Sequence, residues 1–199
     1  MSEDHTHVRE FFGARAADWD RKFPADGPAF ARAVAEFGLR TGDRVLDAGC
    51  GTGRALPALR AAVGPSGTVI GADLTPQMLA AAHDAGRAGA AALLLADVTR
   101  LPLREGVLDA VFAAGLIAHL PDPESNLREL ARVVRPGGRL ALFHPIGRAA
   151  LAARHCRALS PDDRRAEPNL RPLLSSAGWE LTSYADEDDR FLALATRRP

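Results

Sequence analysis

One stretch of this 199-residue chain decides the fold: Val45-Leu46-Asp47-Ala48-Gly49-Cys50-Gly51-Thr52-Gly53. It begins as a short apolar strand, passes through a glycine-rich turn and leads into a helical pattern that runs to about Val63. Glycine is needed where the backbone takes unusual φ values or approaches a ligand closely. The stretch therefore predicts a strand, a ligand-binding turn and a helix.

Strands and helices alternate on both sides of this stretch. After a strand at residues 44–47, further strands are expected at 68–72, 92–96, 108–113 and 139–143. Helices are expected from Thr75-Pro76 to about Ala85 and over 123–134, the latter closed by Pro136-Gly137-Gly138. Short apolar strands separated by helices indicate a parallel sheet that is covered on both faces. The pattern predicts a doubly wound α/β fold.

The two ends of the chain depart from this alternation. Residues 8–37 have helical spacing and are expected to form two helices, broken at Pro24, Gly27 and Pro28. Near the C-terminus, strands at 179–184 and 191–196 flank an acidic turn that is too short for a crossover helix. We therefore expect a C-terminal antiparallel hairpin at the edge of a mostly parallel, seven-stranded sheet.

Composition limits the class of protein. Apolar residues make up 47% of the chain, and 25 basic residues balance 25 acidic residues, which is typical of one globular domain and argues against a nucleic-acid partner. No stretch is long and apolar enough to predict a membrane span. Two cysteines provide no disulfide framework and no paired metal-ligand spacing, so no metal site is expected. With a polar, leaderless N-terminus, these features predict a cytoplasmic protein.

The spacing of the glycines distinguishes between two kinds of nucleotide site. Dinucleotide-binding loops have the pattern G-x-G-x-x-G, whereas this loop has G-x-G-x-G, with Arg54 where the third glycine would stand. Asp47 precedes the loop, where its carboxylate would repel a pyrophosphate but would suit an ammonium group. A nicotinamide-dependent oxidoreductase on a similar fold remains the alternative.

The stretch from Val45 to Gly53 resembles motif I of the class I S-adenosylmethionine-dependent methyltransferases, in their small-molecule, UbiE-like branch. The segment Asp73-Leu74-Thr75-Pro76-Gln77-Met78-Leu79 is similar to the family's D-x-S/T-x-x-M-L, and matching segments follow at 95–98, 108–123 and 134–138. The resemblance covers about residues 44–143. It implies a Rossmann-like methyltransferase fold, S-adenosylmethionine as cofactor and S-adenosylhomocysteine as product.

The resemblance also assigns roles to individual residues. Asp73, 20 residues after Gly53, would bind the ribose hydroxyls, while Leu74 and Met78 would line the adenine. Asp97 and the Val98 amide would bind the edge of the adenine. The cofactor site expected in this way consists of Phe12, Arg15, Trp19, Asp47, Gly49, Cys50, Gly51, Gly53, Asp73, Leu74, Met78, Asp97, Val98, Ala114 and Gly115.

The resemblance divides the single domain, residues 1–199, into three parts. Residues 1–38 would form a helical lid, residues 39–143 the donor-binding core, and residues 144–199 the acceptor-side helices and the hairpin. Phe12, Arg15 and Trp19 would close over the donor, although they could simply pack the lid helices on the sheet. Residues 145–174 would set acceptor specificity, and basic residues there (Arg148, Arg154, His155 and Arg157, beside Cys156) suggest an anionic or phenolic acceptor.

Two histidines are candidates for a general base. His119 follows the fourth expected strand and His144 follows the fifth, and imidazole titrates near neutrality. Either could instead only bind the substrate or the backbone. The acceptor is expected to be a small molecule, because motifs of DNA-methylating enzymes are absent; the protein would act as a monomer or homodimer. A non-catalytic, regulatory S-adenosylmethionine-binding protein is the third possibility.

Overall fold

The structure of the chain, a computed structural model, describes residues 3–23 and 26–199. Pro24, expected to break the N-terminal helical region, lies outside the described residues. The following helix nevertheless begins at Gly27, with Pro28 in its first turn, where a missing amide hydrogen costs nothing. A break between two helical parts of this region is therefore present.

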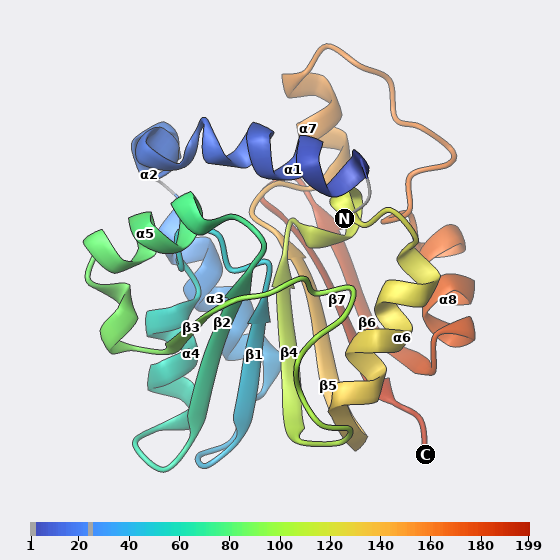
Figure 1. Cartoon of the computed structure of the whole chain (residues 1–199). Coiled ribbons are helices and arrows are strands. Elements are labelled where there is room, and N and C mark those ends of the chain that lie inside the picture. The colour runs from blue at the N-terminus through green and yellow to red at the C-terminus, as the bar shows by residue number, and fades with distance from the viewer. Residues whose placement is uncertain (1–2, 24–25) are drawn as a thin grey trace.

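A seven-stranded sheet forms the centre of the molecule (Figure 1). Its order is β3-β2-β1-β4-β5-β7-β6. Strands β1 to β5 are parallel, and β7 runs antiparallel between β5 and β6. The predicted fold, with its C-terminal hairpin, is confirmed. The strands are β1 (Arg44–Ala48), β2 (Thr68–Asp73), β3 (Ala92–Leu95), β4 (Leu108–Ala114), β5 (Val134–His144), β6 (Trp179–Glu187) and β7 (Arg190–Arg197).

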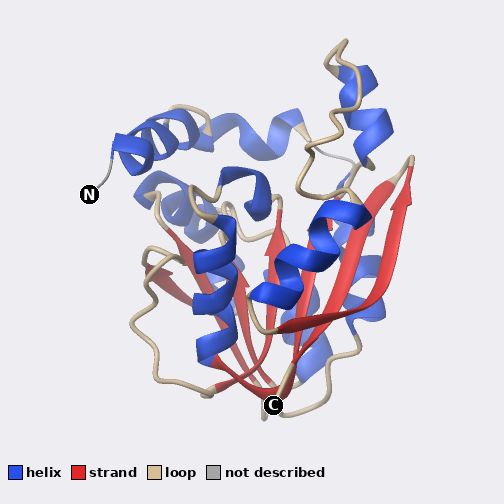
Figure 2. Cartoon of the chain, turned by 90° about the vertical axis from the view of Figure 1, so that its right-hand side faces the viewer, coloured by secondary structure: helices blue, strands red, loops and turns tan. Residues whose placement is uncertain are grey.

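Helices cover both sides of the sheet (Figure 2). One apolar core joins α3 and α4 to the sheet, and a second joins α6 and α8 to its other face. The helices are α1 (Glu3–Gly13), α2 (Trp19–Lys22), α3 (Gly27–Phe37), α4 (Leu56–Val63), α5 (Pro76–Asp84), α6 (Pro123–Val133), α7 (Arg148–Arg154) and α8 (Glu167–Ser176); single turns are η1 (Ala16–Asp18), η3 (Arg87–Gly89) and η4 (Leu116–His119).

The order of the strands reverses at β1, which has β2 on one side and β4 on the other. In such sheets, ligands bind beyond the carboxyl ends of the strands at this point. Helices α1 and α2 lie across that edge of the sheet, near α7 (Figure 1). Helix α1 and the turn η1 contact α5 at the side of the sheet, and α2 contacts η1. The fold therefore encloses the space above the switch point.

The connection from α6 to β5 differs from the expectation. Pro136-Gly137-Gly138 was predicted to close the helix before a strand at Arg139, but β5 begins at Val134, directly after the helix. Gly137 has a φ of 71°, and a Cβ on Gly138 would lie 2.8 Å from the Asp109 carbonyl oxygen. The pairing with β4 also shifts register here. These residues form a bulge within the strand, because its backbone approaches β4 too closely for larger side chains.

Candidate functional site

A cavity of about 520 Å³ lies above the carboxyl ends of the central strands. Its floor comes from the loops after β1, β2, β3, β4 and β5, and α1, α2 and α7 contribute to its cover. This volume is within the range of small-molecule sites, roughly 300–1,000 Å³. Both the glycine turn and the loop after β5 line this one cavity.

The glycine turn has the conformation that the sequence predicted. Gly49, Gly51 and Gly53 have φ values of 69°, 54° and 79°, in the left-handed region that favours glycine. Gly49 and Gly51 line the cavity, but Gly53 does not. A Cβ on Gly53 would lie 2.8 Å from a methyl carbon of Leu56. Gly53 therefore allows close packing at the start of α4 and does not itself face the cavity.

Asp47 is a buried carboxylate at the end of β1. It is 1% exposed, lines the cavity, and its Oδ1 has no hydrogen-bond partner among the described residues. Burial, and then the nearby charge of Asp73, raise the pKa of Asp47 to about 8. A buried carboxylate without a partner is costly. The site therefore favours a ligand that brings a cation to Asp47.

Asp73 holds the glycine turn against the end of β2. Its Oδ2 accepts a hydrogen bond of 2.8 Å from the Gly51 amide, and its Oδ1 accepts one of 2.8 Å from the Thr75 amide. Burial raises the pKa of Asp73, and these hydrogen bonds oppose that rise. A carboxylate has about four acceptor positions, so it can still accept from two ligand hydroxyls. Asp73 is thus placed to bind a diol.

Apolar side chains line the cavity next to Asp73 in sequence. Leu74 and Met78 line it, and Met78 is almost fully buried. Asp97 and Val98 line the cavity after β3, where the Asp97 Oδ1 accepts from the Thr99 amide at 2.8 Å. Apolar walls with a few polar groups at one edge are typical of a site for a heteroaromatic ring.

Aromatic side chains of the N-terminal helices form part of the cavity's cover. Phe12 lies 5.6 Å from Trp19 between ring centroids, and it meets His119 edge to face at 5.0 Å. Phe12 and Trp19 line the cavity, whereas Arg15 does not. The Arg15 guanidinium lies 3.7 Å over the Phe11 ring and donates to the Phe11 carbonyl. The expectation that Arg15 reaches the cavity is therefore wrong in this conformation.

A cluster of charges connects the N-terminal helices to the glycine turn, and sequence reasoning missed it. The Asp20 carboxylate accepts from Thr52 Oγ1 at 2.7 Å, Arg54 Nε at 2.9 Å and Arg87 Nη1 at 2.6 Å. Arg54 also pairs with Asp26 at 3.0 Å. Burial opposes ionisation of Asp20, but the hydrogen bonds prevail and lower its pKa. We call Asp20, Asp26, Thr52, Arg54 and Arg87 the Asp20 cluster.

The two candidate histidines differ in their surroundings. His119 contacts Phe12, and burial lowers its pKa. His144 is held at its Nδ1, which lies 2.7 Å from the Ile146 carbonyl oxygen and 3.1 Å from the Ile146 amide nitrogen. The contact with the carbonyl oxygen requires a proton on Nδ1, whereas the contact with the amide requires a lone pair there. We assign the proton to Nδ1 because the contact with the carbonyl oxygen is shorter, and an unprotonated nitrogen would repel that oxygen. Nδ1 therefore carries the proton and Nε2 has the free lone pair.

The loop after β5 supplies basic side chains to the cavity, although not all of those expected. Arg154 and His155 line it, as does Arg165, which sequence reasoning did not single out. Arg148 turns to Asp186, its Nε lying 2.8 Å from the carboxylate. Cys156 and Arg157 are exposed and do not line the cavity. Only the tertiary structure separates these groups, because all lie on one short, basic stretch.

The expected site is thus largely assembled in one cavity. Residues expected from sequence that line it are Phe12, Trp19, Asp47, Gly49, Cys50, Gly51, Asp73, Leu74, Met78, Asp97, Val98, Ala114, Gly115, His119 and His144. Residues that the expectation missed include Val8, Phe23, Asp26, Thr52, Arg54 and Arg165. Their signals are individually weak, because isolated aromatic and charged residues also occur in ordinary packing and on surfaces.

Two kinds of site are not found in the part of the chain that the structure describes. Within residues 3–23 and 26–199, no three histidine, cysteine or acidic side chains gather so that they could hold a metal ion. None of the helices in these ranges has the length and apolarity needed to cross a membrane.

Known proteins similar to this chain share its central region. Residues 46–142 match the methyltransferase domain family. The ubiquinone/menaquinone biosynthesis C-methyltransferase UbiE of Pseudomonas fluorescens is 37% identical over 151 residues, which are 71% of this chain and 59% of UbiE. The chain thus spans less than two thirds of that relative's length.

Solved structures agree in fold. A methyltransferase from Aquifex aeolicus that depends on S-adenosylmethionine aligns with a TM-score of 0.69 and 27% identity, covering 84% of this chain and 89% of the other. Magnesium protoporphyrin IX methyltransferase of Synechocystis, solved with bound S-adenosylmethionine, has a TM-score of 0.70 at 19% identity, with coverage of 99% and 98%.

The fold and the site together define a Rossmann-like α/β protein whose cavity has the Asp47 and Asp73 side chains at the ends of two neighbouring strands. Over its central region the chain matches the methyltransferase domain family, and it is similar to class I S-adenosylmethionine-dependent methyltransferases of the UbiE-like branch. Its cofactor is S-adenosylmethionine. The buried, unpartnered oxygen of Asp47 fits the cofactor's ammonium, and Asp73 fits its ribose diol.

Proposed function

We propose that the protein transfers a methyl group from S-adenosylmethionine to a small-molecule acceptor by in-line displacement. The observation that carries this proposal is the pair Asp47 and Asp73, one at the end of β1 and one at the end of β2, across the glycine turn. The buried Asp47 carboxyl group offers no positive charge to a pyrophosphate, and this argues against the nicotinamide alternative.

In this proposal the cofactor lies along the carboxyl ends of β1 to β4. Asp47 binds its ammonium, Asp73 binds the ribose, and Leu74, Met78, Asp97 and Val98 surround the adenine. Gly49, Cys50, Gly51, Ala114 and Gly115 provide backbone surface that a bound molecule can approach closely, and Gly53 supports the turn from behind. Phe12 and Trp19 cover the cofactor, while Arg15 stays outside.

S-adenosylmethionine supplies an electrophilic methyl group on a sulfonium. The chain's own residues then have to orient the acceptor and exclude water, which together account for much of a methyltransferase's rate. The aromatic cover of Phe12, Trp19 and Phe23 excludes water from the cavity. Where the attacking atom carries a proton, His144 Nε2 removes it, since Nδ1 donates to the Ile146 carbonyl and fixes the ring. His119 binds or positions the acceptor.

We also propose the division of the domain that the resemblance implies. Residues 1–38 act as a lid, 39–143 bind the donor and 144–199 bind the acceptor. The position of α1 and α2 over the cavity supports the lid (Figure 1). The balanced net charge supports a small-molecule acceptor over nucleic acid. We propose a cytoplasmic monomer or homodimer.

Calorimetric titration with S-adenosylmethionine, S-adenosylhomocysteine and NAD tests the donor site. We expect both adenosyl ligands to bind at micromolar concentration and NAD to give no signal. Binding of NAD alone would establish the oxidoreductase alternative. Tight donor binding without turnover of any acceptor in a broad screen would favour the non-catalytic, regulatory alternative.

Binding of S-adenosylmethionine at pH 7 is expected to release nearly one proton from the protein. Without ligand, Asp47 is mostly protonated at this pH, because its pKa is about 8. A cation beside the carboxylate lowers that pKa, so the proton leaves as the ligand binds. Titrations in buffers of different ionisation enthalpy measure this release. Asp47→Asn should bind the ligand more weakly without releasing a proton; equal release in this variant would contradict the assignment.

Asp20→Ala is expected to accelerate the dissociation of S-adenosylhomocysteine about tenfold or more. The substitution removes charged hydrogen bonds that connect the lid to Thr52 and Arg54, each contributing about 1.5–3 kcal/mol. Stopped-flow displacement measures the rate. Asp18→Ala is the matched control, since Asp18 pairs with the exposed Arg21 and with no other residue that the structure describes. Equal rates for the two variants would show that the Asp20 cluster does not hold the lid.

A further inference from the structure

The part of the cavity beyond the donor turn has mainly apolar walls. Leu116 and Ile117 come from η4, Ile146 and Leu151 from the region after β5, and Phe191 from the start of β7. Such walls favour an acceptor whose body is apolar or aromatic. Three basic residues interrupt these walls: Arg154, His155 and Arg165.

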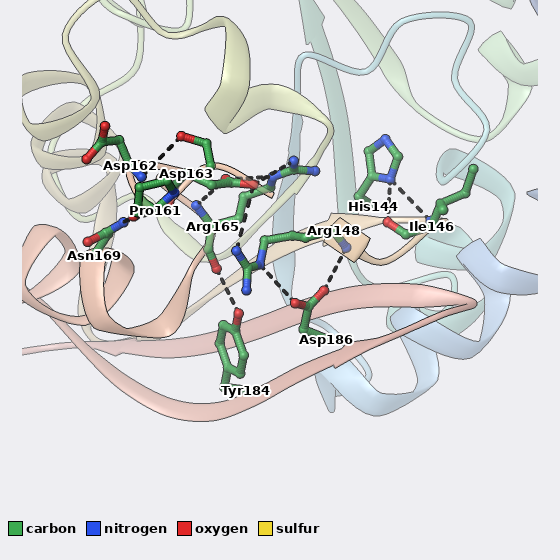
Figure 3. A network of polar contacts seen from close by, with 11 residues as sticks. His144, Ile146, Arg148, Pro161, Asp162, Asp163, Arg165, Asn169, Tyr184 and Asp186 are labelled. Atoms are coloured by element: carbon green, nitrogen blue, oxygen red, sulfur yellow. Dashed lines mark hydrogen bonds and ion pairs between the residues drawn. The ribbon is translucent and has the colours of Figure 1, made fainter. Parts of the chain in front are cut away.

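Arg165 is a fixed cation at this wall. Its Nη2 lies 3.0 Å from Asp163 Oδ2 and its Nε 3.2 Å from Oδ1, while its carbonyl accepts from the Tyr184 hydroxyl at 2.9 Å (Figure 3). Its side chain is only 15% exposed. Asp163 does not line the cavity, so the ligand would meet the guanidinium and not the carboxylate behind it.

The geometry of this pair leaves donors for a ligand. A guanidinium has five N–H groups, and the fork to Asp163 uses one on Nε and one on Nη2. In Figure 3 the Arg165 guanidinium extends towards the side of the His144 ring, whereas that of Arg148 turns to Asp186. The charge of Arg165 also helps to lower the pKa of His144, after the larger effect of burial. Arg165 and the proposed base His144 therefore face the same part of the cavity.

The charge of Arg165 is balanced by the ion pairs around it, so the excess positive charge at this wall comes from Arg154. Arg148 and Arg165 face the carboxylates of Asp163 and Asp186. Arg154, in the last turn of α7, has no ion pair with any described residue. Asp26, an acidic group that also lines the cavity, pairs with Arg54. The acceptor end of the cavity thus has an excess of positive charge, to which the cofactor's sulfonium would add.

We infer that the acceptor is an apolar or aromatic molecule that carries a carboxylate, bound by Arg165 and Arg154. The planar fork of arginine fits a carboxylate, and a low-dielectric wall strengthens the interaction. An ammonium group would face repulsion from both arginines. This inference rests on the proposed function, because it places the acceptor in the part of the cavity that the donor does not occupy.

The test uses matched ligands on protein loaded with S-adenosylhomocysteine: 2-naphthoate, 2-naphthamide and 2-naphthylmethylammonium. Calorimetry should show naphthoate binding at least about tenfold more tightly than the amide, the effect of one charged hydrogen-bonded pair. The ammonium ligand should bind most weakly. The preference for naphthoate should fall to about twofold or less in Arg154→Gln and in Arg165→Gln, by loss of the same interactions. It should persist in Arg157→Gln, an exposed neighbour outside the cavity.

Each contrary outcome has a distinct meaning. Equal binding of naphthoate and naphthamide, no binding of naphthoate, or an undiminished preference in both arginine variants would overturn the inference while leaving the donor site intact. Failure of S-adenosylhomocysteine to bind in the loading step would overturn the proposed function and this inference with it. Because Arg154 is exposed and forms no ion pair within residues 3–23 and 26–199, its variant tests the inference even if Arg165→Gln fails to fold.

Discussion

Asp73→Ala is expected to weaken the binding of S-adenosylmethionine and S-adenosylhomocysteine at least about 100-fold. Two ribose hydroxyls would lose a charged acceptor, at about 1.5–3 kcal/mol for each hydrogen bond. The Gly51 and Thr75 amides would also lose their partner, so the glycine turn would no longer be fixed before the ligand arrives. Calorimetric titration of both ligands measures the loss.

Two controls separate this effect from a general loss of structure. Asp84→Ala removes an exposed carboxylate at the end of α5 and should bind both ligands as the wild type does. Circular dichroism should show that Asp73→Ala keeps its secondary structure, since the side chain is not part of either apolar core. A folded Asp73→Ala variant whose Kd stays within threefold of the wild-type value would show that Asp73 does not bind the ribose. A threefold change corresponds to less than about 1 kcal/mol of binding free energy.

His144→Gln is expected to lower kcat about 10²- to 10⁴-fold for an acceptor that loses a proton, the range typical of a general base. Donor binding should stay unchanged, because His144 lies beyond the residues assigned to the cofactor. His119→Gln should reduce kcat by less, since the His119 ring packs against Phe12 and has no hydrogen bond to a described residue like the one between His144 Nδ1 and Ile146. Single-turnover measurements with an acceptor identified by screening compare the two variants.

The pH dependence gives a second measure of the same role. Burial lowers the pKa of His144, and Arg165 and His119 lower it further, against the opposing effects of the Ile146 hydrogen bond and Asp26. A base acts in its neutral form, so kcat should fall only as the pH drops through a pKa below the ordinary histidine value of about 6.5. Loss of this acidic limb in His144→Gln would support the assignment; an identical limb in both proteins would contradict it.

The residues proposed to bind the donor could be placed at one cavity from the sequence because they follow one another along the chain. Asp47, Asp73 and Asp97 each stand after an apolar strand, and parallel strands bring their carboxyl ends to one edge of the sheet. A short sequence pattern therefore determines a spatial relation between distant residues. The bulge at Gly137 and Gly138 could not be predicted in this way, because the close approach of β4 that requires these glycines is a tertiary contact.

The cover of the cavity was predictable only in part. Phe12 and Trp19 reach the cavity, but the neighbouring Arg15 folds back on Phe11. Helical spacing gives the face of a helix, and it does not say how a long side chain bends from that face. The Asp20 cluster was missed for a similar reason, since Asp20, Arg54 and Arg87 lie far apart in sequence and come together only when the lid meets the glycine turn.

The succession of strands and helices, the glycine turn and the acidic residues at the strand ends could all be predicted from the sequence, because they depend on local backbone preferences and strand direction. Tertiary contacts were needed to show which basic residues after β5 line the cavity and which histidine ring is held by the backbone. Arg148 and Arg165 both follow β5 in sequence. Arg148 pairs with Asp186 and does not line the cavity, whereas Arg165 pairs with Asp163 and does. Such choices depend on partners from distant strands and loops, which no local pattern contains.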